Sequence, residues 1–181
     1  MASLVDRMGR AARLDVHLYE EVEADTGATG QAMLVVVLSS VAAGIGSIGS
    51  MPSGLTGLFV GTLLALLGWY LWAFLTYLIG TKLLPEPQTH ADVGELLRTT
   101  GFSAAPGLLR VLGIIPGFMA ITFAVAGIWM LVAMIIAVRQ ALDYHSTGRA
   151  IGVCLIGWVV QLVMLIIAGA VLGVDPAAAP S

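Results

Sequence analysis

Apolar residues continue without a charge through four long stretches of the chain, and each stretch predicts a transmembrane helix. A helix rises about 1.5 Å per residue, so roughly 20 apolar residues cross a hydrocarbon core about 30 Å thick. None of the four stretches contains Asp, Glu, Lys or Arg. The predicted spans are residues 32–48, 55–79, 118–138 and 151–174.

A fifth segment, residues 99–117, is apolar but carries features that are unusual in a membrane helix. Pro106 and Pro116 shorten or kink a helix, and Arg110 places a charge in the apolar stretch. Two interpretations are open. The segment either crosses the membrane, with Pro116-Gly117 as a tight turn after it, or forms a re-entrant hairpin surrounded by protein or water.

The distribution of basic residues favours a crossing, because Lys and Arg gather in short cytoplasmic loops. With five spans, the N-terminal segment and the basic loops 80–98 and 139–149 lie inside. Loop 49–54 and the tail 175–181, which contain no Lys or Arg, then lie outside. We therefore predict an all-α bundle of five transmembrane helices, N-in and C-out, over residues 29–174, followed by a short external tail.

Residues 1–28 form a polar N-terminal segment. Its apolar residues recur mostly at three- and four-residue steps between Arg7, Arg10 and Arg13, as in an amphipathic helix on a membrane surface. A solvated leader is the alternative. The first apolar run begins only after an acidic stretch, so we expect the segment to stay cytoplasmic, uncleaved and uninserted.

Composition excludes several classes of protein. The chain is 59% hydrophobic and 10% charged over 181 residues, whereas a soluble domain has about a quarter of its residues charged. The net charge of -3 includes no dense basic patch, so we expect no nucleic-acid partner. The single cysteine, Cys154, permits no intramolecular disulfide and no Cys-based metal motif.

Two polar residues inside the predicted spans are candidates for function. A charge at a helix centre costs about 2.5–3.5 kcal/mol on insertion scales, so Arg110 either reaches the head groups or belongs to a buried polar site. Gln161 lies near the middle of the last span, where its amide needs a hydrogen bond from another helix. The expected partners are Ser39, Ser40, Thr122 and Arg110.

Small residues at four-residue spacing indicate close helix packing, within the chain or between copies. The pairs are Gly57 with Gly61, Gly113 with Gly117 and Gly169 with Gly173, beside the series Ala42, Gly46 and Ser50. Aromatic residues crowd the second half of the second span and predict an interfacial belt there. They are Trp69, Tyr70, Trp72, Phe74 and Tyr77.

No catalytic motif is visible, so we predict neither an enzyme nor a bound cofactor. Carboxylates and imidazoles gather on one predicted face, but without metal-ligand spacing, and we predict no metal site. The residues are Glu20, Glu21, Glu23, His90, Asp92, Asp143 and His145.

Three segments resemble the Yip family of small multispanning proteins, the Yip-one domain group, in its short prokaryotic form. They are residues 19–25, which lead into the first span, residues 95–106, and residues 146–150, which open the last span. The resemblance covers roughly residues 15–172. It implies five spans with a cytosolic N-terminus, in agreement with the charge distribution.

The resemblance also carries an expected function. Eukaryotic relatives are associated with Rab-type GTPases, membrane traffic and membrane shaping, but this chain lacks their Asp-Leu-Tyr-Gly-Pro type motif, so GTPase binding is not predicted. We expect a non-catalytic protein of a prokaryotic plasma membrane that binds lipids or partner proteins, including a second copy, as a scaffold for membrane organisation. The alternative is a small channel or transporter built around Arg110 and Gln161.

Overall fold

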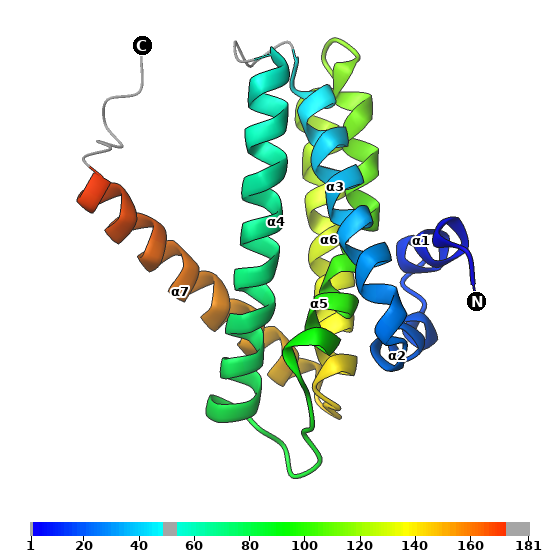
Figure 1. Ribbon diagram of the computed structural model, residues 1–181, viewed down its shortest axis with the longest axis vertical. Coiled ribbons are helices and arrows are strands. Elements are labelled where there is room, and N and C mark those ends of the chain that lie inside the picture. The colour runs from blue at the N-terminus through cyan, green and yellow to red at the C-terminus, as the bar shows by residue number, and fades with distance from the viewer. Residues whose placement is uncertain (1, 49–53, 173–181) are drawn as a thin grey trace.

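A computed structural model of the protein describes residues 2–48 and 54–172, and within these ranges it contains helices and loops but no strands (Figure 1). Four of the helices in the described ranges are long and apolar enough to cross a membrane. They confirm a multi-pass helical membrane protein. These helices are α3 (Thr29–Gly46), α4 (Gly54–Leu78), α6 (Met119–Ala141) and α7 (Thr147–Leu172).

The segment predicted as one helix over 99–117 is instead divided into two pieces. The first is α5 (Val93–Phe102), and the second is the 3-10 helix η4 (Ala105–Ile114). Pro106 lies in the first turn of η4, where a backbone N–H has no partner to lose, so the break falls where the proline is tolerated. At about 1.5 Å per residue for α5 and about 2.0 Å for η4, the two pieces together extend about 35 Å.

Glycines hold α5 and η4 close against α3. A Cβ atom added at any of three glycines would lie within 3 Å of an α3 atom. The three contacts are Gly101 with Ala32, Gly107 with Ser39 and Gly113 with Gly46. The contacting residues are six apart along α5 and η4 and seven apart along α3. Each spacing is about two turns, since a 3-10 helix has 3.0 residues per turn and a packed α-helix about 3.5.

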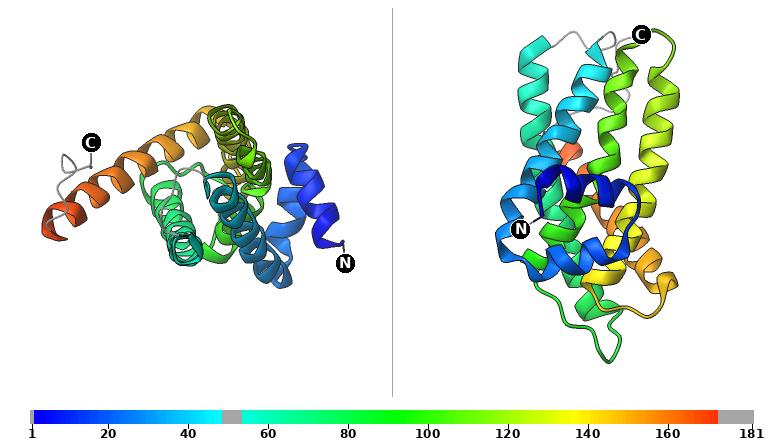
Figure 2. Two further views of the ribbon diagram at one scale, coloured as in Figure 1. Left: turned by 90° about the horizontal axis from the view of Figure 1, so that it is seen from above. Right: turned by 90° about the vertical axis from the view of Figure 1, so that its right-hand side faces the viewer.

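The N-terminal segment is a pair of helices that pack on the flank of the bundle, mainly against α5 and α6 (Figure 2). They are α1 (Leu4–Ala12) and α2 (Val16–Ala24), and the single turn η1 (Thr26–Ala28) joins them to α3. The chain reverses at Leu14, which has a φ of 61°. Leu18, Tyr19 and Val22 are fully buried. The segment is therefore two helices packed on the bundle rather than a single helix or a solvated leader, because its apolar face packs on protein. The position of this pair relative to the membrane surface stays a prediction.

Charges within this helical pair neutralise one another. Arg7 is only 3% exposed and lies 2.8 Å from Glu21 and 2.7 Å from Asp25. Its hydrogen bond holds the pKa of the Asp25 carboxyl below its usual range. Arg98, on α5, is buried and donates to the backbone carbonyls of the last turn of α2, where the helix dipole is negative. These contacts attach the N-terminal helices to the bundle.

The loops that precede α5 and follow α6 meet at one end of the bundle. The Arg149 guanidinium lies 3.3 Å from the Glu86 carboxylate, and the His145 backbone N–H donates to the same side chain at 3.0 Å. Above them α4 ends in a π-helical turn, η3 (Ile79–Leu83). The Tyr144 hydroxyl donates to the Leu84 carbonyl just beyond it, at 2.7 Å.

The other end of the bundle carries the turn between η4 and α6. The Phe118 N–H donates to the Ile115 carbonyl at 3.0 Å, and Gly117 has a φ of 84°. Proline at the second position and a left-handed glycine at the third are typical of a type II turn. The tight turn predicted at Pro116-Gly117 is confirmed.

Candidate functional site

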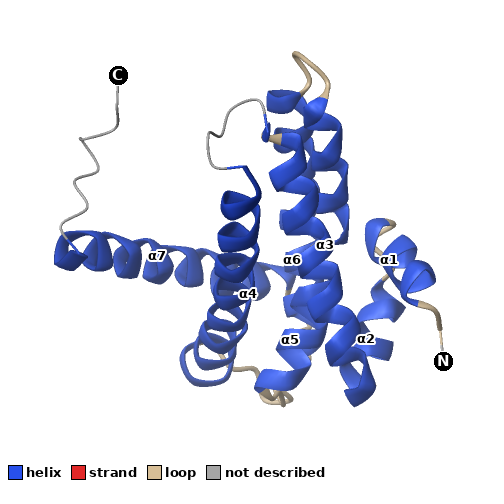
Figure 3. Cartoon of the chain, turned by 45° about the horizontal axis from the view of Figure 1, so that its top comes forward, coloured by secondary structure: helices blue, strands red, loops and turns tan. Residues whose placement is uncertain are grey.

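A cavity of about 680 Å³ lies between α3, α4 and α6. Its volume falls within the range of about 300–1,000 Å³ that is usual for ligand pockets. The lining comes from α3, α4, α5, η4, α6 and α7, and none of it from α1 or α2. The N-terminal helices pack on one side of the bundle, while α7 projects on the other (Figures 2 and 3).

Three polar contacts from α4 and α3 fix the walls of this cavity. The Ser40 hydroxyl donates to Thr62 at 3.2 Å and joins α3 to α4. The Trp69 indole donates to a backbone carbonyl of α5 at 3.1 Å. The Trp72 indole donates to the Met134 sulfur at 3.3 Å and joins α4 to α6. The cavity is therefore bordered by side chains that hold the helices at a set separation.

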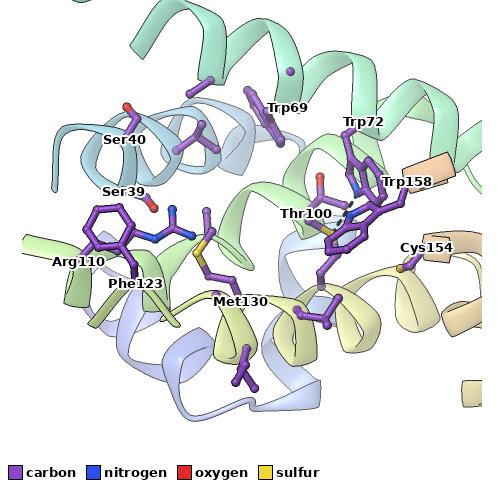
Figure 4. A pocket seen from close by; sticks show the side chains of 18 of the residues that line it. Ser39, Ser40, Trp69, Trp72, Thr100, Arg110, Phe123, Met130, Cys154 and Trp158 are labelled. Carbon is purple, nitrogen blue, oxygen red and sulfur yellow. Dashed lines mark hydrogen bonds between the residues drawn. The ribbon is translucent and has the colours of Figure 1, made fainter. Parts of the chain in front are cut away.

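Arg110 points into this cavity from η4. Its guanidinium carbon lies 5.5 Å from the centre of the Phe123 ring, a favourable cation–π distance. The Nε atom is buried and has no hydrogen-bond partner among residues 2–48 and 54–172, and the lining residues in these ranges include no Asp or Glu. Figure 4 shows the side chain directed between Ser39 and Met130. Of the two roles considered for Arg110, this placement favours the buried polar site.

Gln161 lines the same cavity from α7. Its amide does not make the cross-helix hydrogen bonds that were expected from the sequence. Ser40 bonds to Thr62 instead, and the Thr122 hydroxyl donates to carbonyls of its own helix. The structure thus brings Arg110 and Gln161 to one cavity without joining them.

Aromatic side chains line much of the cavity, and the sequence had indicated another role for two of them. Trp69 and Trp72 were predicted to form an interfacial belt, but Trp72 is only 7% exposed and both line the cavity. Trp158 and Phe123 were not singled out. A usable signal was present on α4, where Ala65, Gly68 and Trp72 share one helix face at three- and four-residue steps. The helices that pack against this face could not be identified from it.

The predicted packing glycines fall into different environments. Gly113 lies against α3, as described above, whereas a Cβ at Gly61 would meet nothing within 4 Å. Gly57 lies on the same helix as Gly61. Ala42 is buried and Gly46 touches η4. Gly169 lies in α7 without described surroundings, and Ser50 and Gly173 lie outside the described residues.

A second cavity, of about 590 Å³, lies at the end of the bundle where the loops meet. Burial, with the nearby charges of Asp143 and Glu95, raises the pKa of Glu23 to about 7. Within residues 2–48 and 54–172, no group of three His, Cys, Asp or Glu side chains is arranged to hold a metal ion. Asp92 instead caps α5. Side chains around this cavity include Glu20, Glu23, Glu95, Arg139, Asp143 and His145.

Comparison with known families identifies the chain over most of its length. A family model described as the Yip1 domain matches residues 17–168. This range includes both cavities, all four long apolar helices except the last residues of α7, and the α5–η4 pair. The search against curated proteins and the search against solved structures gave no match.

Proposed function

The chain belongs to the Yip1 domain family, and from this premise we propose that it is a non-catalytic membrane protein that holds a lipid in the cavity between α3, α4 and α6. The lipid would make it a scaffold for organising the membrane around it. We assign it to a prokaryotic plasma membrane, as the family resemblance suggested.

One observation carries this proposal: an apolar, aromatic-lined cavity lies within the membrane-spanning part of the bundle and contains a cation. Apolar lining surface favours an acyl chain, because that surface has no hydrogen bonds to satisfy. Arg110 and Gln161 add polar groups at defined places on the wall. Ligand sites commonly combine mostly apolar lining with a few placed polar groups.

We further propose five crossings, N-in and C-out. Loops 84–92 and 142–146 contact each other through Glu86 and His145, and Arg149 in the first turn of α7 pairs with Glu86, so these segments share one end of the bundle. Helix α6 crosses between that end and the 115–118 turn, and the chain must therefore also cross through α5 and η4. Their combined length of about 35 Å is sufficient. Lys82, Arg98, Arg139 and Arg149, which lie in the helices on either side of these loops, support a cytoplasmic location for this end.

The proposal is tested by lipid retention after purification in a mild detergent. Gly127 lines the cavity, and a Cβ there would meet nothing within 4 Å, so Gly127→Leu adds a side chain into open cavity space. The matched control is Gly61→Leu, on an exposed position of α4 that does not line the cavity. Mass spectrometry should find lipid bound to the wild type and the control, and much less on the Gly127 variant. Equal retention by all three proteins would refute the proposal.

A transporter is the second candidate function, because Arg110 and Gln161 line one cavity as that alternative required. Vesicles containing the protein provide the test. Solute flux that Gly127→Leu abolishes and Gly61→Leu preserves would favour transport, whereas retained lipid without flux favours the scaffold.

A further inference from the structure

The charge of Arg110 has no counterion in the part of the chain that the structure describes. Its side chain donates no hydrogen bond to a described residue, and it forms no ion pair. Phe123 provides one favourable contact, but a π face does not replace a negative charge. An arginine stays protonated at any physiological pH. A cation in surroundings of low dielectric constant is costly until an anion reaches it.

The cavity around this cation is suited to an amphiphile rather than to a small ion. Ser39 and Ser40 lie near the guanidinium at one end of the cavity, and Trp72, Cys154 and Trp158 lie at the other (Figure 4). At the first end Arg110 and the Ser39 hydroxyl can donate to a phosphate and its ester oxygens, whereas the Ser40 hydroxyl already donates to Thr62. The second end is apolar and fits hydrocarbon.

The position of Arg110 along the bundle indicates which end of a lipid it meets. Arg110 lies in the second half of η4, five residues before the Ile115–Phe118 turn, and its backbone carbonyl lies against Gly46 at the end of α3. The guanidinium is therefore close to the end of the bundle opposite the Glu86–Arg149 loops. A head group would be at that end, and an acyl chain would extend toward the centre of the bundle.

We propose that the cavity selects an anionic phospholipid, with its phosphate on Arg110 and an acyl chain directed toward Trp72 and Cys154. This inference rests on the proposed lipid-binding function and specifies the class of lipid. The lipid comes from the leaflet at the 115–118 turn. Arginine is suited to this role because its planar guanidinium binds phosphate oxygens in a bidentate manner. A zwitterionic lipid binds less well because its ammonium group is repelled by the same side chain.

The test is the head-group ratio of lipid retained from nanodiscs that contain equimolar phosphatidylglycerol and phosphatidylcholine. The wild type should retain phosphatidylglycerol in preference, because only phosphatidylcholine carries an ammonium group that Arg110 repels, and Arg110→Gln should bring the retained ratio close to that of the nanodisc. The phosphate contact with Arg110 is common to both lipids, and a charge-assisted hydrogen bond contributes at least about 1.5 kcal/mol, so the same variant should also lower the total retained lipid about tenfold. Arg110→Lys should keep a part of the preference, because the charge remains. Arg13→Gln, which removes an exposed arginine outside the cavity, should leave the ratio unchanged.

Each outcome separates this inference from the function on which it rests. A wild-type ratio equal to that of the nanodisc, or an unchanged ratio in Arg110→Gln, overturns the anionic selectivity while total retained lipid still reports on the lipid site. A wild type that retains no lipid overturns the proposed function itself. Should Arg110→Gln fail to fold, the wild-type preference and its reduction in Arg110→Lys decide the question.

Discussion

At Gly113 the backbone of η4 lies so close to the end of α3 that a single methyl group should separate the two elements. In Gly113→Ala the new Cβ would lie 2.8 Å from the Gly46 carbonyl oxygen and 3.2 Å from the Phe123 ring. Ordinary van der Waals contact begins at 3.4 Å, so η4 and α3 must move apart by about 0.6 Å. The obstacle is backbone, which cannot rotate away.

A gap of this size weakens every contact along the shared surface, since a separation of 0.5–1 Å forfeits about a quarter to a half of the dispersion energy. Overpacking of this kind costs about 1–3 kcal/mol. For a chain of this length each kcal/mol lowers Tm by about 2–4 °C. We therefore expect Gly113→Ala to unfold about 2–12 °C below the wild type in detergent, as measured by tryptophan fluorescence.

The matched control is Gly61→Ala, at a position where the added Cβ meets nothing within 4 Å. An alanine there gains up to about 1 kcal/mol of helix propensity, so Tm should stay constant or rise. If both variants unfold at the same temperature, the six-residue glycine spacing is not what holds η4 on α3.

Three further outcomes test other parts of the structure. Arg98→Ala removes the hydrogen-bond donors to the end of α2, so the amide hydrogen-exchange rates in α1 and α2 should rise at least about tenfold. The control Lys82→Ala, at an exposed position, should leave these rates unchanged. If neither variant changes the rates, Arg98 does not hold these helices on the bundle. The pKa of Glu23 is raised from 4.5 to about 7, so the folded protein keeps a proton that the unfolded chain loses first, and stability should fall as pH rises from about 5 to about 7. Glu23→Gln should lose that part of the pH dependence, and a Tm profile identical to the wild type would contradict the assignment. Single cysteines at His90 and Ile115, in a cysteine-free background, should label from opposite sides of the membrane; labelling from one side would refute a crossing by α5 and η4.

The division of the fifth segment shows where sequence reasoning reached its limit. Pro106 correctly marked a break, because a proline removes a donor wherever it stands. The 3-10 form of η4 could not be predicted, since it depends on contact with α3: Gly107 and Gly113 match the spacing of Ser39 and Gly46 only at three residues per turn. A six-residue glycine repeat was present in the sequence, but its meaning required the partner helix.

The sequence also identified Arg110 and Gln161 as unusual, because a polar group in an apolar run is costly in any fold. The sequence did not predict that both residues line one cavity, or that the side chains of Trp69 and Trp72 line it as well. Those outcomes depend on the distance between α4 and α6 and on where α7 leaves the bundle, which no local pattern specifies.

By itself, the sequence determined that this chain is a helical, multi-pass membrane protein of the Yip family. Run length and hydropathy are sufficient for that conclusion, since each helix satisfies its own backbone hydrogen bonds and meets lipid independently. Only the tertiary structure decided that the N-terminal helices pack on protein, that η4 is tightly wound against α3, and that a cation with no counterion among the described residues faces an apolar cavity. These features arise from contacts between distant segments, and contacts of that kind exist only once the helices have packed.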